Sequence, residues 1–407
     1  MALIRFVVAR IALCVLMFSP ALVAQCAADD RSNQAPPDSS SQVAFYPVPV
    51  LPPTTIWVRV LYVTNRVVSG TGRRVEDYSN SVARRDASLG TSIVAIPCDH
   101  RIGTLESASI FRFQFHNDPR KHITVLSVAP QKSDQFFKEL SSRVASSHGR
   151  EVLVFIHGFN VSFEDSLRRT AQLAYDLKFD GVPIAFSWPS RSIGVSKLQT
   201  AAAILSPVAA AALNIASART EYAAAGENAD ETVFSLREFL NDVRKKSGAT
   251  TIHLIAHSMG ARVLAKVLSE IGEPRPSPRE ASLREIVLAA PDISVGLFKR
   301  LAEGFHSKAK RITLYASSRD HVLVLSKLIN DHPRAGETGV DIVVMPGIDT
   351  IDVSAVDTEL AGHFYYGDNR SVVSDIFQLI RSVSPPGERF GLVRMLAPAG
   401  PYWLFRP

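Results

Sequence analysis

Ser258 lies in the run Ala-His-Ser-Met-Gly at 256–260, between an apolar segment and a helical pattern. This layout is typical of a nucleophile elbow, a sharp strand-to-helix turn that lifts a serine hydroxyl above the edge of a parallel sheet. Small residues flank such a serine because the strand and helix backbones come too close for large side chains. The helix N-terminus offers partial positive charge and free N–H groups to a developing oxyanion. The alternative interpretation is a serine that only caps an ordinary helix.

A serine nucleophile needs a histidine base and an acid that orients this base. In such a fold the order along the chain is nucleophile, acid, histidine, each in a loop just past the carboxyl end of a strand. Asp320 closely follows the buried strand predicted at 311–316 and is the predicted acid. His363 lies in a glycine-flanked loop after the last predicted strand and is the predicted base.

Other residues compete for both of these roles. Asp292 follows the preceding strand and is the alternative acid, although it could instead cap a helix or position its loop. Asp320 could likewise be the N-cap of the helix that follows it. His257 points away from its neighbouring serine on such a turn, so it cannot be the base. His321 and His332 are weaker candidates than the predicted base.

The oxyanion hole needs a backbone N–H group just after the first central strand. The predicted strand Val152–Ile156 runs into the turn His-Gly-Phe-Asn at 157–160, a type of turn that occurs there in such enzymes. We predict that the N–H groups of Phe159 and Met259 form the hole. One such donor typically stabilises the transition state by about 3 kcal/mol.

Strand and helix patterns alternate along the chain from residue 56 onward. Apolar runs predict strands of a sheet buried on both faces, and amphipathic segments between them predict helices. Such alternation favours βαβ units, so the sequence predicts an α/β fold with a mostly parallel sheet, helices on both faces and antiparallel N-terminal edge strands. The predicted strands are 56–65, 110–115, 122–129, 151–156, 182–187, 251–256, 285–290, 311–316 and 340–345, and the predicted helices are 133–147, 162–179, 231–246, 259–271, 295–307, 321–330 and 370–383.

Residues 1–24 have the pattern of an export signal, with two arginines, a short apolar run and small residues that end at Ala24. The apolar run is short for a membrane span. Lipoprotein processing in front of Cys26 is an alternative to plain cleavage near Ala24, although Gln25 fits such a site poorly. Residues 25–55, rich in Asp, Ser, Gln and Pro, predict a disordered linker.

The composition limits the classes of partner and cofactor. The formal net charge of +6 comes from scattered basic residues, which argues against nucleic-acid binding. Of the three cysteines, Cys14 belongs to the leader, whereas Cys26 and Cys98 could pair in an oxidising compartment. The sequence contains no Cys/His cluster with metal-ligand spacing, so we expect no metal site. The chemistry inferred from Ser258 requires no cofactor.

Residues 190–230 include a long Ala-rich stretch, 194–226, which follows a strand on the expected active-site edge. It predicts one or two weakly amphipathic helices that are broken at Pro207. One interpretation is a mobile apolar lid that binds acyl chains or touches a membrane. The other is a surface helix packed by small residues. The tail at 384–407 either packs on the domain or reaches a partner.

Six motifs jointly resemble the bacterial α/β-hydrolase family DUF900, whose members are esterase/lipase-like. The resemblance runs from about residue 57 to the C-terminus. It implies an α/β-hydrolase domain, predicted here at 56–383 with edge strands and a helix at 56–148, and a triad of Ser258, Asp320 and His363. It implies no particular substrate, and the long connection after residue 190 departs from the family. The motifs lie at 61–66 (LYVTNR), 154–160 (VFIHGFN), 186–190 (FSWPS), 253–260 (HLIAHSMG), 289–293 (AAPDI) and 315–320 (YASSRD).

These features together predict an exported serine hydrolase of the bacterial periplasm or cell envelope that cleaves small-molecule or lipid esters. A lipid on Cys26 or the Ala-rich stretch would associate it with a membrane. Amidases, peptidases and acyltransferases remain alternatives, because the same triad and acyl-enzyme serve all of them. A further alternative is a catalytically silent protein that uses the hydrolase fold to bind a ligand or a partner.

Overall fold

The computed structural model describes residues 55–107, 117–190, 207–272, 280–356 and 363–406. The predicted leader, the linker with Cys26, the strand predicted at 110–115 and the first part of the Ala-rich stretch lie outside these ranges. The chain divides into two compact units, one made of 1–57, 95–100 and 106–124, the other of 58–94, 101–105 and 125–407. All predicted catalytic residues belong to the second unit.

The described strands form one sheet of eleven strands, in the order β10-β11-β9-β8-β7-β6-β4-β5-β1-β2-β3. Neighbours from β1 through β5, β4, β6, β7, β8 and β9 to β11 are parallel, and β10 is antiparallel to β11. The fold is therefore α/β with a mostly parallel sheet. The strands are β1 (Thr55–Val68), β2 (Tyr78–Pro97), β3 (Thr124–Gln131), β4 (Glu151–Ile156), β5 (Val182–Ser187), β6 (Thr251–His257), β7 (Ser282–Ala289), β8 (Arg311–Ala316), β9 (Asp349–Asp352), β10 (Leu392–Ala397) and β11 (Gly400–Phe405).

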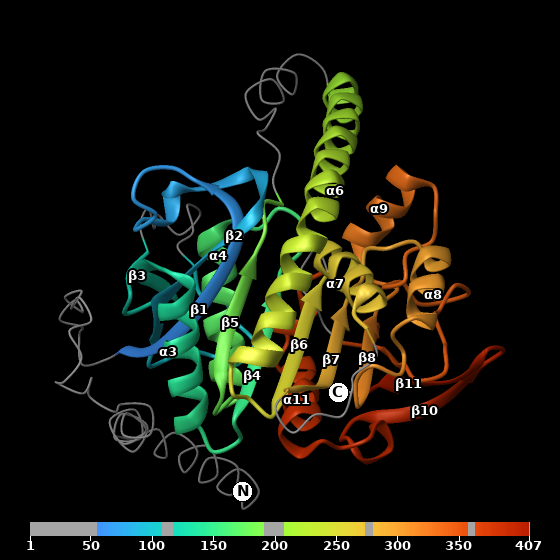
Figure 1. Ribbon diagram of the computed structural model, residues 1–407. Helices are drawn as coiled ribbons and strands as arrows, with labels where there is room; N and C mark the ends of the chain where they lie inside the picture. The colour runs from blue at the N-terminus through green and yellow to red at the C-terminus, as the bar shows by residue number, and fades with distance from the viewer. Residues whose placement is uncertain (1–54, 108–116, 191–206, 273–279, 357–362, 407) are drawn as a thin grey trace, which may run out of the picture. The chain divides into compact units, whose positions relative to one another are not determined.

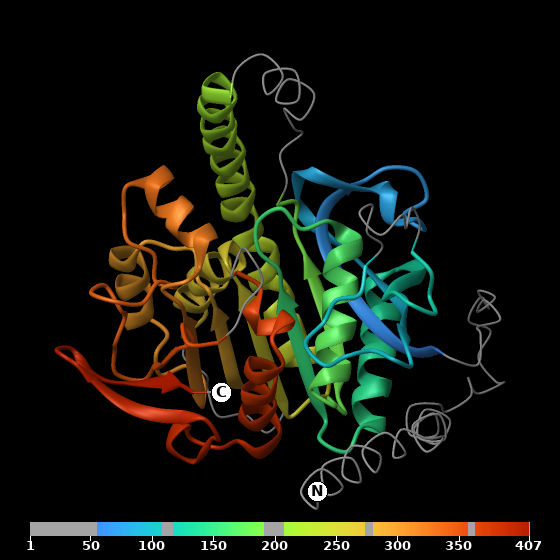
Figure 2. The same cartoon turned by 180° about the vertical axis from the view of Figure 1, so that it is seen from behind.

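Helices cover both faces of the parallel part of the sheet, and the alternation of side chains along β4 shows how. Val152, Val154 and Ile156 belong to the core on one face, together with residues of α3, α6, α7 and α8. Leu153 and Phe155 belong to the core on the opposite face, with residues of α4 and α11. Figure 1 shows α6 and α7 in front of the sheet, and Figure 2 shows α4 from the other side. The helices are α3 (Ser133–Ser146), α4 (Phe163–Asp176), α6 (Pro207–Lys246), α7 (Met259–Glu270), α8 (Val295–Glu303), α9 (His321–Asn330), α10 (Tyr365–Asp368) and α11 (Arg370–Phe377), with shorter 3-10 or π turns at Val75–Asp77, Gln378–Ser382 and Pro386–Glu388.

One expectation for the sheet is wrong, and the structure adds a detail to another. The run 340–345, predicted as the last parallel strand, is irregular, and the strand β9 forms instead at Asp349–Asp352. Val343 is buried in the core, which explains the apolar run. Its carbonyl oxygen accepts a hydrogen bond from the Thr350 hydroxyl rather than from the backbone of a neighbouring strand. The N-terminal strands lie together at one edge of the sheet, as expected. The first of them, β1, lies between β5 and β2 and is parallel to β5, in keeping with its fully buried residues.

The structure describes two further segments whose conformation the sequence left open, the C-terminal tail and part of the Ala-rich stretch. The tail adds β10 and β11 to the sheet, and β11 pairs with β9, so the tail packs on the domain. The second part of the Ala-rich stretch is helical from Pro207, which is the first residue of the 40-residue helix α6, a position that suits proline. No helix within the described ranges combines the length and apolarity needed to cross a lipid bilayer.

Candidate active site

Ser258 lies between β6 and α7 in a strained backbone conformation. Its φ of 54° and ψ of −123° fall outside the regions that residues with a side chain normally adopt. Its N–H donates to the Ala289 carbonyl at 2.9 Å, which ties the turn to the end of β7. The side chain does not form the expected helix cap. A serine that is strained and does not cap its helix fits the nucleophile elbow better than the N-cap interpretation.

The turn is possible only because two glycines allow close backbone contacts around Ser258. A Cβ added at Gly260 would lie 2.3 Å from the His157 carbonyl oxygen, so the first turn of α7 is pressed against the end of β4. A Cβ added at Gly158 would lie 2.8 Å from the Ser258 Cβ. The glycine of the turn after β4 therefore lies directly against the serine. This contact brings together the predicted nucleophile and the turn predicted to carry an oxyanion donor.

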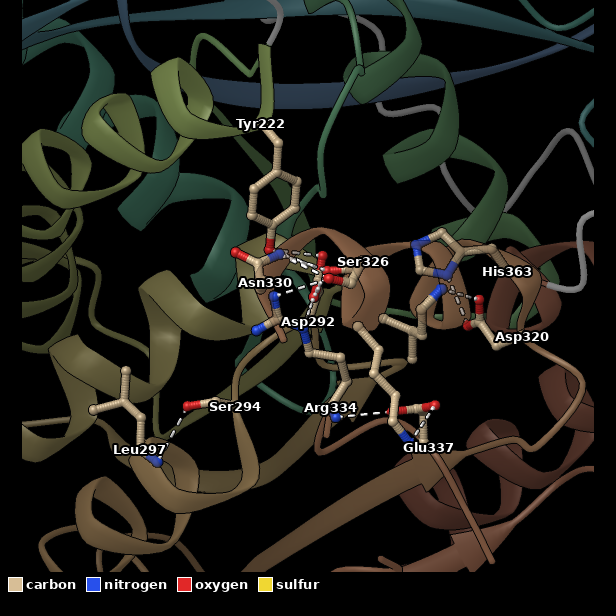
Figure 3. Close-up of polar contacts among 12 residues, drawn as sticks. Tyr222, Asp292, Ser294, Leu297, Asp320, Ser326, Asn330, Arg334, Glu337 and His363 are labelled. Atoms are coloured by element: carbon tan, nitrogen blue, oxygen red, sulfur yellow. Dashed lines mark hydrogen bonds and ion pairs between the residues drawn. The ribbon is translucent and has the colours of Figure 1, made fainter. Parts of the chain in front are cut away.

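Asp320 and His363 form a short hydrogen bond. The His363 Nδ1 lies 2.7 Å from the Asp320 Oδ2, and both side chains are buried (Figure 3). Since a carboxylate can only accept, Nδ1 carries a proton and donates this hydrogen bond. The other oxygen, Oδ1, accepts the N–H groups of Val322 and Leu323 at 3.1 and 3.0 Å. Asp320 thus caps α9 and orients the imidazole at the same time, so the two interpretations of this residue are compatible.

Asp292, the alternative acid, is committed to other partners. Its Oδ1 accepts the Ser326 hydroxyl at 2.7 Å and lies 3.2 Å from the Arg334 Nε, and its Oδ2 accepts the Tyr222 hydroxyl at 2.9 Å. Figure 3 shows this cluster apart from the Asp320–His363 pair. The Asp292 N–H donates to the Ser258 carbonyl at 3.2 Å. Asp292 therefore supports the turn and joins α6 to α9 through Tyr222 and Ser326.

His257 is not oriented as a base but contacts the loop of the predicted base. Its Nε2 lies 3.0 Å from the His363 carbonyl oxygen, so Nε2 donates, and the two rings lie 4.5 Å apart. Burial first, and then the neighbouring His363, lower the pKa of His257 well below its ordinary value, so the ring is neutral. His321 and His332 are exposed. The hydrogen bond from His257 holds the backbone of the His363 loop beside the elbow, a role that the sequence did not predict.

The C-terminal end of the turn after β4 is held by Ser190. The N–H groups of Asn160 and Val161 donate to the Ser190 carbonyl and hydroxyl oxygens, each at 3.0 Å. Phe159 lies within this turn, and Met259 is the first residue of α7, where backbone N–H groups have no helical acceptor. Both predicted oxyanion donors therefore belong to segments in contact with Ser258 or next to it in sequence.

A cavity of about 330 Å³ lies beside this centre. Its walls include His157 and Asn160 of the turn after β4, Phe364 next to His363, and Arg169, whose guanidinium is paired with Asp368 at 2.7 Å. Ser258, Asp320 and His363 do not line it. Within the described residues, no three His, Cys, Asp or Glu side chains are grouped to hold a metal ion.

The chain matches the model of a protein family. The family described as "Alpha/beta hydrolase of unknown function (DUF900)" matches residues 132–382, which is more than half of the chain. This range includes the turn after β4, the elbow and the loops of Asp320 and His363. No curated protein matches the sequence significantly.

Several solved structures of low sequence identity also align with the chain. A YdeN-like hydrolase from Pectobacterium atrosepticum is 12% identical, with 61% of this chain and 99% of that chain covered and a TM-score of 0.29. The esterase Pf2001 from Pyrococcus furiosus is 13% identical, with 50% and 72% covered and a TM-score of 0.26. A lipase-esterase related protein from Clostridium acetobutylicum is 10% identical, with 57% and 93% covered and a TM-score of 0.27.

Proposed function

Because the chain belongs to the DUF900 family of α/β-hydrolases and is a hydrolase by that membership, we propose that it cleaves carboxylic esters with a triad of Ser258, His363 and Asp320. The observation that carries the proposal is the 2.7 Å hydrogen bond between His363 Nδ1 and Asp320 Oδ2. It directs the Nδ1 proton to the carboxylate, so Nε2 is the ring nitrogen that acts as the base in the proposed reaction. The strained backbone of Ser258 supports the same role for this serine.

The proposed reaction proceeds through an acyl-enzyme. The Ser258 hydroxyl attacks the ester carbonyl carbon while His363 Nε2 takes its proton, and Asp320 stabilises the imidazolium. The N–H groups of Phe159 and Met259 bind the oxyanion of the tetrahedral intermediate. His363 then protonates the leaving alcohol. Water attacks the acyl-enzyme with the same imidazole as base, which releases the acid and restores the serine.

Replacement of the nucleophile tests this proposal. We expect Ser258→Ala to lower kcat for a p-nitrophenyl ester by about 10⁶-fold, because no other group can form the acyl-enzyme. Ser282→Ala, at an exposed position on β7, is the matched control and should leave kcat unchanged. Retention of substantial ester cleavage by a clean Ser258→Ala preparation would rule out this nucleophile. Amide substrates and competing acyl acceptors, tested on the wild type, separate esterase from amidase or acyltransferase activity.

We further propose that the protein is exported. The state of Cys98 helps to decide whether the mature N-terminus carries a lipid on Cys26 or a disulfide bond. Cys98 is disulfide-bonded, and the other two cysteines, Cys14 and Cys26, lie outside the described residues. A disulfide is compatible with an oxidising compartment. A Cys26 that carries a thioether-linked lipid could not also form a disulfide. The mass of the mature N-terminal peptide, measured before and after reduction, therefore separates lipidation of Cys26 from its pairing with Cys98.

A further inference from the structure

Arg66 ends the motif at 61–66 and is fully buried, although the proposed mechanism does not use it. A buried guanidinium is costly unless its donors are satisfied. Its Nε donates to the Ser187 hydroxyl at 3.0 Å, and one terminal nitrogen donates to the Asn80 side chain at 2.8 Å. The other terminal nitrogen donates to the Val161 carbonyl at 2.9 Å and lies 3.3 Å from the His157 Nε2. Arg66 therefore contacts both the side chain of His157, at the start of the turn that carries the proposed oxyanion donor Phe159, and the backbone of Val161, just past its end.

The order of the strands explains why these residues meet. β1, β5 and β4 are adjacent parallel strands, so their carboxyl ends lie at the same edge of the sheet. Arg66 lies near the end of β1, Ser187 ends β5, and His157 follows β4. The motif at 186–190 adds Trp188, whose ring nitrogen donates to the His157 carbonyl at 2.7 Å. Two motifs without a role in the proposed chemistry thus converge on the third, which carries the oxyanion turn.

The partners of His157 determine which of its ring nitrogens carries the proton. Nδ1 lies 2.9 Å from the Gly158 carbonyl oxygen, which can only accept, so Nδ1 is the donor. Nε2 lies 3.0 Å from the Trp188 backbone N–H and faces Arg66, and both of these groups can only donate. Burial, and then the charge of Arg66, lower the pKa of His157 well below its ordinary value. The ring is therefore neutral, with Nε2 as acceptor.

The carbonyl that His157 holds belongs to the same peptide unit as the Phe159 N–H. In a trans peptide the C=O and N–H bonds point in opposite directions. A hydrogen bond that fixes the Gly158 carbonyl therefore also fixes the direction of the Phe159 N–H. This restraint matters because the backbone at Gly158 has no side chain to limit its rotation.

We propose that Arg66 is a positioning residue for the oxyanion hole, acting through His157 to keep the Gly158–Phe159 peptide from turning its N–H away from the substrate. The inference rests on the proposed function and deepens it. Arg66 donates to the Nε2 of His157 and so keeps the ring proton on Nδ1, where it bonds the Gly158 carbonyl. Arg66 also holds the Val161 carbonyl, so both ends of the turn are fixed by one side chain.

Three substitutions test the proposal by esterase kinetics with matched oxoester and thionoester substrates. Sulfur is a poor hydrogen-bond acceptor, so an intact hole favours the oxoester, and a loosened hole loses this preference. We expect Arg66→Met and His157→Gln to lower kcat for the oxoester by about 10- to 10³-fold. The upper value is the effect expected when one oxyanion donor is lost completely. KM should stay within about threefold, since a transition-state contact is lost. The oxoester/thionoester ratio of kcat/KM should fall in parallel.

The third substitution, His157→Asn, separates the two ring nitrogens. Its amide NH₂ can replace Nδ1–H as the donor to Gly158, whereas the glutamine amide extends toward the position of Nε2. His157→Asn should therefore retain much more of the oxoester preference than His157→Gln. Arg389→Met is the matched control, because Arg389 is also a buried arginine, paired with Asp375 at 3.0 Å. It should lower stability without changing the oxoester/thionoester ratio.

The possible failures can be told apart. If fluorophosphonate probes do not label Ser258 in the wild type, the proposed function fails. If Ser258 is labelled but Arg66→Met and His157→Gln keep the wild-type oxoester/thionoester ratio, the positioning role is wrong. Equal ratios in His157→Asn and His157→Gln would also overturn it. If Arg66→Met does not fold, Ser187→Ala provides a milder test. It removes the acceptor of the Arg66 Nε–H and a hydroxyl that lies 3.4 Å from the His157 Nε2, and it should shift the ratio in the same direction by a smaller factor.

Discussion

Asp320 and Asp292 occupy similar positions but have different surroundings. Each follows the carboxyl end of one of two neighbouring parallel strands, β8 and β7, and both are buried. Asp320 bonds an imidazole with one oxygen and caps a helix with the other. Asp292 forms an ion pair with a guanidinium and accepts hydrogen bonds from a tyrosine hydroxyl and a serine hydroxyl. Their positions along the chain are almost equivalent, so their partners assign the roles.

The difference shows what a catalytic acid requires. A carboxylate opposite a permanent cation is already neutralised, and it has no free oxygen for a histidine. A carboxylate opposite an imidazole faces a group that gains and loses a proton during the reaction, so its charge stabilises one state more than the other. By this criterion Asp320 is suited to catalysis and Asp292 to holding α6, α9 and the elbow together.

Of the two acids, Asp320 should show the larger effect on turnover when it is replaced by asparagine. The asparagine can still cap α9 with its oxygen, so the free energy of unfolding should change little. It cannot hold the imidazole in the required tautomer, and kcat should fall by about 10⁴-fold. Steady-state kinetics and denaturant unfolding on the same preparation check both expectations. A fall of less than about tenfold would remove Asp320 from the triad.

Asp292→Asn should show the reverse pattern. The substitution leaves the buried Arg334 guanidinium without a counter-charge, so the free energy of unfolding should drop by about 3–5 kcal/mol. Turnover of the folded fraction should stay within about tenfold of the wild type, because Asp292 contacts only the backbone of Ser258. Urea unfolding and kinetics below the transition measure the two effects. A loss of turnover comparable to that of Asp320→Asn, without a loss of stability, would reverse the assignment of the two acids.

The comparison also shows which parts of the site could be predicted from the sequence. The strands at 151–156, 182–187 and 311–316 have the predicted bounds, because strands buried on both faces consist of nearly continuous apolar residues. Loops after such strands meet at one edge of the sheet, so Ser258, Asp320 and His363 could be proposed from their order alone. Position along the chain also favours Asp320 over Asp292, whereas the partners Arg334 and Tyr222 cannot be recognised from the sequence.

The remaining features depend on contacts that spacing along the chain does not show. Arg66, His157 and Ser187 meet only because β1 lies beside β5, a pairing that the alternation of strands and helices does not specify. The signal that could have found them is polar: Thr64-Asn65-Arg66 follow directly on an apolar run, and a buried strand rarely ends in such residues without a partner. The prediction of a strand at 340–345 is wrong, because a buried segment is apolar whether or not it forms a strand.

The smallest expected effect concerns Glu285, a third buried carboxyl group, on β7. Within the described residues, neither of its carboxylate oxygens has a hydrogen-bond partner. Burial raises its pKa from 4.5 to about 7, against the opposing charge of Arg311. Between these values the folded protein holds a proton that the unfolded chain releases, so this group makes stability fall as pH rises through that window.

Glu285→Gln removes this titration. We expect its Tm relative to the wild type to rise between pH 5 and pH 8, by a few degrees or less, as scanning calorimetry can measure. A Tm difference that is the same at both pH values would show that Glu285 does not titrate in this range. Asp320 and Asp292 have imidazole and guanidinium partners, so this test isolates a buried carboxyl that lacks one.

Labelling of the full-length protein with a fluorophosphonate probe, followed by peptide mapping, tests the proposed triad most directly. We expect one labelled serine, Ser258, with labelling lost in His363→Ala, strongly slowed in Asp320→Asn and retained in Asp292→Asn. Labelling of a different serine, or labelling of Ser258 that is indifferent to the loss of His363, would contradict it.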